Sequence, residues 1–300
     1  MSKALITSRD PKGLHAVGLF EAAYNKAQLD DTRAQRLNER GDEFQGGIAK
    51  LIAELTVSNQ YADEEVRSSY EYPTEYKGSK PISEQVDILA KLFNLSLGAT
   101  SEYIKKVLPT LQLPDGAEGW FAIPSVDAVA ARFFPEVKNP AERYCRSVQL
   151  VLQKIGESRK FYNYREGQIT PDRLRVHART AHAFDLIAET QKGDILIVAA
   201  QLGMRHRGRS VRRAREVFTA NEFGLGAFAT GSIVLTHPER IVRWEELDMD
   251  CAGDEFGPDA DGRFSRAPYF SFSVGRVGFD TDSFGSASVG YGSVSAFLPQ

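Results

Sequence analysis

Residues 194–200 read Asp-Ile-Leu-Ile-Val-Ala-Ala, a short run rich in aliphatic and β-branched side chains. A run of this length between polar segments is typical of a strand buried on both faces. Residues 210–218 predict a short helix, and the aliphatic run 227–235 predicts a second buried strand. Strand, helix and strand within about 40 residues indicate a compact βαβ unit.

The C-terminal end adds two patterns to this unit. Residues 269–274 alternate between polar and apolar side chains, and Gly275-Arg276 can turn the chain back into 277–279, which predicts a β-hairpin. The Gly/Ser-rich segment 283–295 is interspersed with aromatic and aliphatic residues that a flexible linker would not contain. We therefore expect the tail to dock across the body of the protein or to take part in a homo-oligomer.

Before residue 193 the apolar pattern is helical. Apolar residues recur at spacings of three and four near 14–24, 44–55, 82–95 and 101–108. Asn139-Pro140 is a start signal for a helix that ends near Gly156, and Thr170-Pro171 is a start signal for one that runs to about Thr190. The sequence thus predicts an α+β protein, with a mainly helical domain at 1–192 and a mixed α/β domain at 193–300.

The composition indicates a soluble, cytoplasmic protein. The shares of apolar residues (42%) and charged residues (26%) are those of an ordinary globular chain. The two cysteines, Cys145 and Cys251, lie far apart and predict reduced thiols. The N-terminus has no secretory pattern, and the longest apolar stretches are far shorter than the roughly 20 residues of a membrane-spanning helix. We expect no membrane partner.

The net charge of -3 conceals an uneven distribution. Residues 143–215 carry 16 basic against 6 acidic side chains, an excess of +10, whereas residues 1–142 carry -5 and residues 216–300 carry -8. Such asymmetry indicates an anionic partner. Two alternatives remain open: the basic middle can pack against the acidic tail of the same chain, or opposite charges can meet between copies.

Two stretches in the second half resemble a family of uncharacterised bacterial hypothetical proteins. Residues 203–215 read Gly-Met-Arg-His-Arg-Gly-Arg-Ser-Val-Arg-Arg-Ala-Arg, and residues 221–228 read Asn-Glu-Phe-Gly-Leu-Gly-Ala-Phe. The resemblance implies a bacterial cytoplasmic origin. It implies no activity, cofactor or partner.

The loop 201–210 is the strongest candidate for a binding site. If it leaves the end of a strand and enters a helix, its free backbone N–H groups and the helix dipole favour anions. Guanidinium groups bind phosphate or carboxylate in a bidentate manner, so the ligand could be a phosphorylated molecule, an acidic surface or a nucleic acid. The residues expected to bind the anion are Arg205, Arg207, Arg209, Ser210, Arg212 and Arg213. The alternative is a basic turn neutralised by neighbouring carboxylates.

The segment 244–261 contains eight carboxylates and no Lys or Arg. Acidic residues at some EF-hand positions suggest a loose Ca²⁺ or Mg²⁺ site, although the spacing departs from the EF-hand pattern. Its candidate ligands are Asp248, Asp250, Asp254 and Asp259. The alternatives are a solvated acidic loop or a surface that faces the arginines.

Two histidines are candidates for acid–base work. His206 lies in the arginine loop and His237 precedes a proline, and neither has a partner that the sequence identifies. Gly224-Leu225-Gly226 mimics part of a dinucleotide fingerprint. We reject that interpretation because the run precedes a predicted strand and no helix is expected after it.

The function that these patterns favour is that of a binding or assembly protein, which holds an anionic partner through the arginine loop. The alternative is an enzyme that acts on a phosphorylated or carboxylated small molecule, with metal assistance from the acidic segment. An enzyme needs a deep pocket that unites the arginines with a histidine or carboxylate, whereas a binding protein needs a broad surface. No cofactor is indicated.

Overall fold

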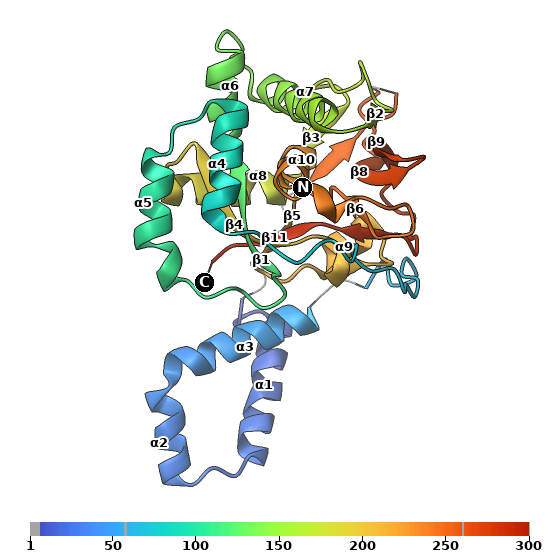
Figure 1. The fold of residues 1–300 in the computed structure, drawn as a ribbon. Helices are drawn as coiled ribbons and strands as arrows, with labels where there is room; N and C mark the ends of the chain where they lie inside the picture. The colour runs from blue at the N-terminus through green and yellow to red at the C-terminus, as the bar shows by residue number, and fades with distance from the viewer. Residues whose placement is uncertain (1–6, 57–58, 260, 300) are drawn as a thin grey trace. The chain divides into compact units, whose positions relative to one another are not determined.

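The computed structural model describes residues 7–56, 59–259 and 261–299, and they form two separate units. The predicted α+β class is confirmed, because the N-terminal part is helical and the mixed sheets lie in the C-terminal part (Figure 1). We call residues 7–56 the N-terminal unit and residues 59–299 the body.

The N-terminal unit consists of helices α1 (Pro11–Lys26), α2 (Asp31–Glu39) and α3 (Gly41–Leu55). Asp30 caps α2 by accepting a hydrogen bond from the Arg33 amide at 2.8 Å. The rings of Phe20 and Phe44 bring α1 and α3 together, with centroids 6.0 Å apart. No side chain that the structure describes in this unit is buried. The unit therefore has helices but no core.

The body contains the remaining described helices and short 3₁₀ turns. The helices are α4 (Ile82–Phe93), α5 (Gly98–Lys106), α6 (Val126–Phe133), α7 (Pro140–Ser158), α8 (Ala178–Gln191), α9 (Val211–Val217) and α10 (Ala227–Thr236). The 3₁₀ turns are η1 (Leu108–Thr110), η2 (Met204–His206) and η3 (Pro238–Arg240). The start of α7 is as predicted, because Asn139 accepts hydrogen bonds from the amides of Ala141 and Glu142.

A four-stranded antiparallel sheet contains β1 (Gly119–Pro124), β4 (Ile195–Gln201), β5 (Glu222–Gly224) and β11 (Ser295–Phe297). Its order is β1-β4-β11-β5. Every residue of β4 is buried, as expected from its uniformly aliphatic sequence. Because β11 lies between β4 and β5, the Gly/Ser-rich tail ends as an internal strand of this sheet, which confirms that the tail docks on the body.

A seven-stranded mixed sheet contains the other strands. They are β2 (Phe161–Asn163), β3 (Leu174–Val176), β6 (Asp248–Asp250), β7 (Asp254–Phe256), β8 (Arg266–Ser273), β9 (Arg276–Ser283) and β10 (Tyr291–Ser293). The predicted hairpin is confirmed, because β8 and β9 pair along their whole length. Strands β10, β6, β8, β7 and β3 lie in that order, and β9 pairs with both β8 and β2.

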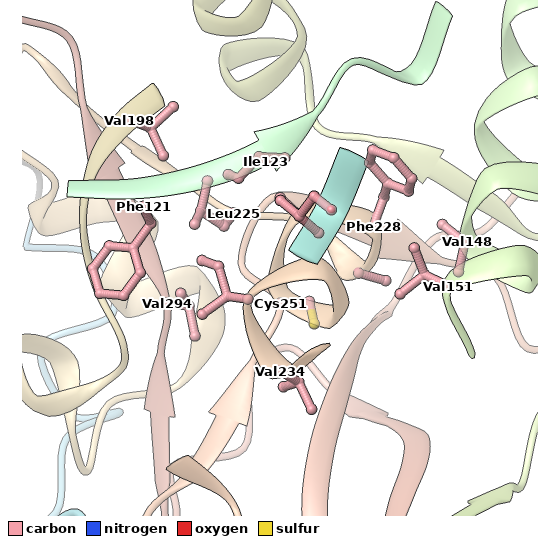
Figure 2. Close-up of a cluster of buried hydrophobic side chains, with 14 of the residues drawn as sticks. Phe121, Ile123, Val148, Val151, Val198, Leu225, Phe228, Val234, Cys251 and Val294 are labelled. Atoms are coloured by element: carbon pink, nitrogen blue, oxygen red, sulfur yellow. The ribbon is translucent and has the colours of Figure 1, made fainter. Parts of the chain in front are cut away.

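Residues 227–235, which the sequence predicted to be a strand, form helix α10. This helix contacts α4, α7, β1 and β8, so it lies between the two sheets, and Figure 2 shows the apolar side chains that pack around it. All its residues except Leu235 are buried. A helix that is apolar on all sides has no amphipathic period, and a short apolar run then looks the same as a buried strand.

Two further expectations, the helix from Thr170 and the βαβ unit, were wrong. The helix expected from Thr170 begins only at Ala178, because residues 174–176 pair with β7 as strand β3. The βαβ unit is absent, since both neighbours of β4 are antiparallel to it. The expected domain boundary near residue 192 falls within the body, where β1 and β4 pair across it.

Candidate functional site

The arginine run begins where β4 ends. Arg205, Arg207 and Arg209 lie in the loop between β4 and α9, as the sequence predicts. Ser210 is the N-cap of α9, and its hydroxyl accepts a hydrogen bond from the Arg213 amide at 3.1 Å. The loop thus connects the end of a strand to the start of a short helix.

Two glutamates from the start of the body pair with the arginines of α9. The Arg212 Nε atom donates to Glu64 at 2.8 Å, and Arg213 forms an ion pair with Glu65. Arg213 also donates to Glu216 at 2.8 Å from the same helix. The hydrogen bond from Arg212 holds the pKa of Glu64 below its usual value. These ion pairs fasten α9 to the segment around residue 64.

The arginines of the loop differ in their partners. The Arg205 Nε atom lies 3.4 Å from the Glu222 carboxylate, and the Arg209 Nε atom lies 3.3 Å from that of Glu65. Arg207 donates to a backbone carbonyl at 3.0 Å and has no ion pair among the residues that the structure describes. Neighbouring carboxylates therefore neutralise most of the run.

His206 belongs to a buried polar network at the end of the four-stranded sheet. Its Nε2 atom lies 2.6 Å from Glu222 Oε1, and Arg209 contacts its Nδ1 atom at 3.2 Å. Burial lowers the pKa of His206. Burial alone would raise the pKa of Glu222, but its hydrogen bond with His206, assisted by Ser295 and Arg205, lowers that pKa to about 2. A neutral imidazole with its proton on Nε2 satisfies both contacts, because Nδ1 then accepts from Arg209.

This network lacks the geometry of a nucleophile and its base. Ser295 donates its hydroxyl proton to Glu222 at 2.6 Å, and not to the imidazole. His206 is 1% exposed and Glu222 is fully buried. An activated serine needs the imidazole within hydrogen-bond reach and access to substrate. The arrangement instead joins β11, β5 and the arginine loop.

His237, the second histidine candidate, is also enclosed. Its Nε2 atom accepts the Lys80 amide at 3.0 Å, and its Nδ1 atom lies 2.8 Å from the Thr236 hydroxyl. Burial lowers the pKa of His237 to about 4. The imidazole is therefore neutral at physiological pH and is packed against the ring of Phe121. The structure does not bring His206 and His237 to one site.

The four metal candidates do not converge. Asp248 and Asp250 lie on β6, Asp254 lies on β7 and points to α10, and Asp259 is exposed. Strands occupy the positions where an EF-hand has helices. Within residues 7–56, 59–259 and 261–299, no three His, Cys, Asp or Glu side chains are grouped so that they could hold a metal ion.

The carboxylate of Asp254 accounts for the glycine at position 226 in the run Gly224-Leu225-Gly226. A strand, β5, precedes Gly226 and helix α10 follows it, so our reason for rejecting a dinucleotide fingerprint was wrong. The run nevertheless does not fit a dinucleotide site. The Asp254 carboxylate accepts the Ala227 amide and the Tyr144 hydroxyl, both at 2.7 Å, so it occupies the helix N-terminus where a phosphate would bind. A side chain on Gly226 would collide with that carboxylate.

A buried network around Arg240 was not predicted from the sequence. Arg240 is fully buried, and it donates to the carbonyls of Leu247 (2.9 Å) and Leu202 (2.8 Å). Its guanidinium lies 4.1 Å from the centre of the Tyr72 ring, whose hydroxyl donates to Glu118 at 2.6 Å. No local pattern could have found this network, because Tyr72 and Leu202 come from segments far from Arg240 in the sequence. The network anchors the start of the arginine loop.

Comparison with models of protein families, with curated proteins and with solved structures finds no match. None of the helices in the described ranges is both long enough and apolar enough to span a bilayer.

Proposed function

We propose that this chain is a binding or assembly protein, and that the N-terminal unit pairs with the same unit of a second copy. The observation that carries the proposal is a set of large apolar side chains on helices that have no core. On α1 and α3 these are Leu14 (59% exposed), Val17 (40%), Leu19 (60%), Phe20 (42%), Tyr24 (39%), Leu51 (54%), Ile52 (56%) and Leu55 (77%). Large apolar side chains that stay exposed on helices without a core are typical of an interface.

Helix stability supports the need for a partner. Helices of 9 to 16 residues are marginal in water unless an apolar face is packed. Within the N-terminal unit α1 and α3 meet through one pair of rings, and none of the described side chains is buried. A second copy would supply the missing core.

Charge favours a second copy as the occupant. The sequence of α1 contains two lysines and one glutamate, and that of α3 contains three acidic residues and one lysine. In a twofold pairing, α1 of each copy packs against α3 of the other copy. The net charge of α1 is +1 and that of α3 is -2, so opposite charges meet in both of the equivalent contacts. Apolar contacts supply the affinity, and the charges select the orientation.

The enzyme alternative has less support. Both histidine candidates are buried and their ring nitrogens have protein partners. An anionic partner on the arginine loop is a second candidate, which the charge of Arg207 favours, since it forms no ion pair within the described parts of the chain. Such a partner would have to compete with the glutamates that pair with the other arginines.

Light scattering after size exclusion tests the proposal on the full chain. We expect a dimer, and we expect the double substitution Leu51→Asp and Leu55→Asp to give a monomer with an unchanged melting temperature of the body. Val274→Asp is the matched control, because Val274 is an exposed apolar residue (83%) on the body. A monomeric wild-type chain would overturn the proposal, and so would a double variant that remains dimeric.

A further inference from the structure

One face of the seven-stranded sheet is acidic. The register places Asp250 opposite Tyr269, and Tyr269 opposite Asp280. Because residues two apart on a strand share a face, Asp248 and Asp282 lie on this face as well. The other face carries apolar side chains of the core, such as Phe270 and Phe279. Carboxylates from two strands, β6 and β9, are thus gathered on one side of the sheet.

A small cavity lies on this acidic face. Its volume is about 10 Å³, which suits a single water molecule or a bare metal ion. Its lining consists of Asp250, Asp282, Ser283, Ser286, Ser288, Tyr291, Val211 and Ala267. All six polar members offer oxygen atoms, and Asp282, Ser283 and Ser286 are exposed, which leaves a route from solvent.

Asp250 is the member that indicates a ligand. It is only 7% exposed, and no donor among the described residues forms a hydrogen bond with its carboxylate. Asp254 is as deeply buried, but it accepts hydrogen bonds from Tyr144 and from the Ala227 amide. A buried carboxylate without donors is costly. Burial and the neighbouring charge of Asp282 raise the pKa of Asp250 to about 8.

We propose that this cavity binds a hard divalent cation, with Ca²⁺ as the best match, held by the carboxylates of Asp250 and Asp282 together with serine and tyrosine hydroxyls. Oxygen-only ligands select hard cations over Zn²⁺ or Cu²⁺, which prefer nitrogen and sulfur. Mg²⁺ demands a near-regular octahedron of oxygen atoms and usually keeps several waters. Ca²⁺ accepts irregular oxygen shells.

The proposed site differs from the EF-hand-like set that the sequence suggested. It keeps Asp250, but it takes its other ligands from β9 and from the serine-bearing loop that leads to β10. With two carboxylates and otherwise neutral oxygens, the affinity belongs to the weak range of about 10⁻⁴ to 10⁻³ M. The bound ion would tie the Gly/Ser-rich segment to the sheet.

Thermal unfolding of the full chain in EDTA, in Ca²⁺ and in Mg²⁺ tests the site. At about ten times the dissociation constant, Ca²⁺ should raise the melting temperature by roughly 3 to 6 °C, and Mg²⁺ should raise it less. Asp250→Asn should abolish the Ca²⁺-dependent rise. Asp259→Asn, which changes an exposed acid outside the cavity, should retain the full rise.

Asp282→Asn provides a second variant if Asp250→Asn fails to fold, because Asp282 is exposed and its substitution should leave the fold intact. It should reduce the Ca²⁺-dependent rise by at least half. The alternative is that the two carboxylates share a proton and bind no ion. If Ca²⁺ does not change the melting temperature of the wild type, that alternative is supported and the proposal is overturned. A Ca²⁺-dependent rise that is retained in both cavity variants would also overturn the proposal.

Discussion

The N-terminal unit and the body solve the problem of stability in opposite ways. In the body, charged side chains such as Arg240 and Glu222 are fully buried, and each forms hydrogen bonds with several groups of the same chain. A buried network specifies one arrangement of a core where its groups are paired, as the Glu222 carboxylate is with His206, Thr219 and Ser295. The N-terminal unit leaves leucines and phenylalanine exposed on short helices. This difference underlies our proposal that the N-terminal unit packs against a second copy, whereas the body buries its own core.

The most damaging change to the body should be the loss of its C-terminal strands. A chain that ends at Gly290 lacks β10 and β11, and β11 separates β4 from β5 in the four-stranded sheet. We expect this truncated chain to lose cooperative unfolding by circular dichroism. A chain that ends at Leu298 is the control and should unfold like the wild type. Cooperative unfolding of the shorter chain would show that the tail is dispensable.

Glu222→Gln should have the next largest effect. It replaces the buried carboxylate that pairs with His206 and Ser295 by a neutral amide, so we expect a loss of about 1.5 to 3 kcal/mol in the free energy of unfolding. Glu102→Gln removes an exposed ion pair with Lys106 and should change it by less than about 1 kcal/mol. Urea denaturation measures both. If both variants lose the same free energy of unfolding, the buried position of Glu222 adds nothing to stability.

His237 should make the body sensitive to mild acid. Its folded-state pKa of about 4 lies below the ordinary value of 6.5, so between these values the unfolded chain binds a proton that the folded chain does not. Stability from this group is therefore present above pH 6.5 and decreases as the pH falls toward 4, by about 3 kcal/mol in total.

Urea denaturation at several pH values checks this dependence. His237→Gln should make the decrease between pH 6.5 and 4 smaller, with the remainder coming from groups such as His206, whose pKa is also lowered by burial. His182→Gln, at an exposed position, should leave the decrease unchanged. A decrease of the same size in the His237 variant would assign the acid sensitivity to other groups.

The smallest effect concerns the arginine loop. If Arg207 contributes to an anion site, Arg207→Gln should lower the salt concentration that elutes the protein from heparin and should reduce the salt dependence by about one charge. Arg146→Gln is the control, since Arg146 already pairs with Glu136 and Glu142. Identical elution of all three proteins would leave the arginine run with a structural role alone.

The sequence predicted the elements whose signals are local. The Asn139 cap, the buried run of β4 and the β8–β9 hairpin all follow from neighbouring residues. The predictions from the sequence were wrong where contacts between distant segments determine the secondary structure. Residues 227–235 are a helix because two sheets surround them, and residues 174–176 form a strand because β7 pairs with them.

The candidate site shows the same division. The loop position of Arg205, Arg207 and Arg209 could be predicted from the strand before it and the cap after it. Their partners could not, because Glu65 and Glu222 come from distant segments. For the same reason the sequence placed Asp250 in a local loop with Asp254, whereas the fold directs their side chains to different surroundings.

Hydrogen exchange of the full chain at increasing protein concentration tests the contrast between the two units most directly. We predict that amides of α1 and α3 become more protected as the concentration rises, while those of β4 and α10 stay protected throughout, because only the N-terminal unit depends on a second copy. Protection of α1 and α3 that is independent of concentration would contradict the account.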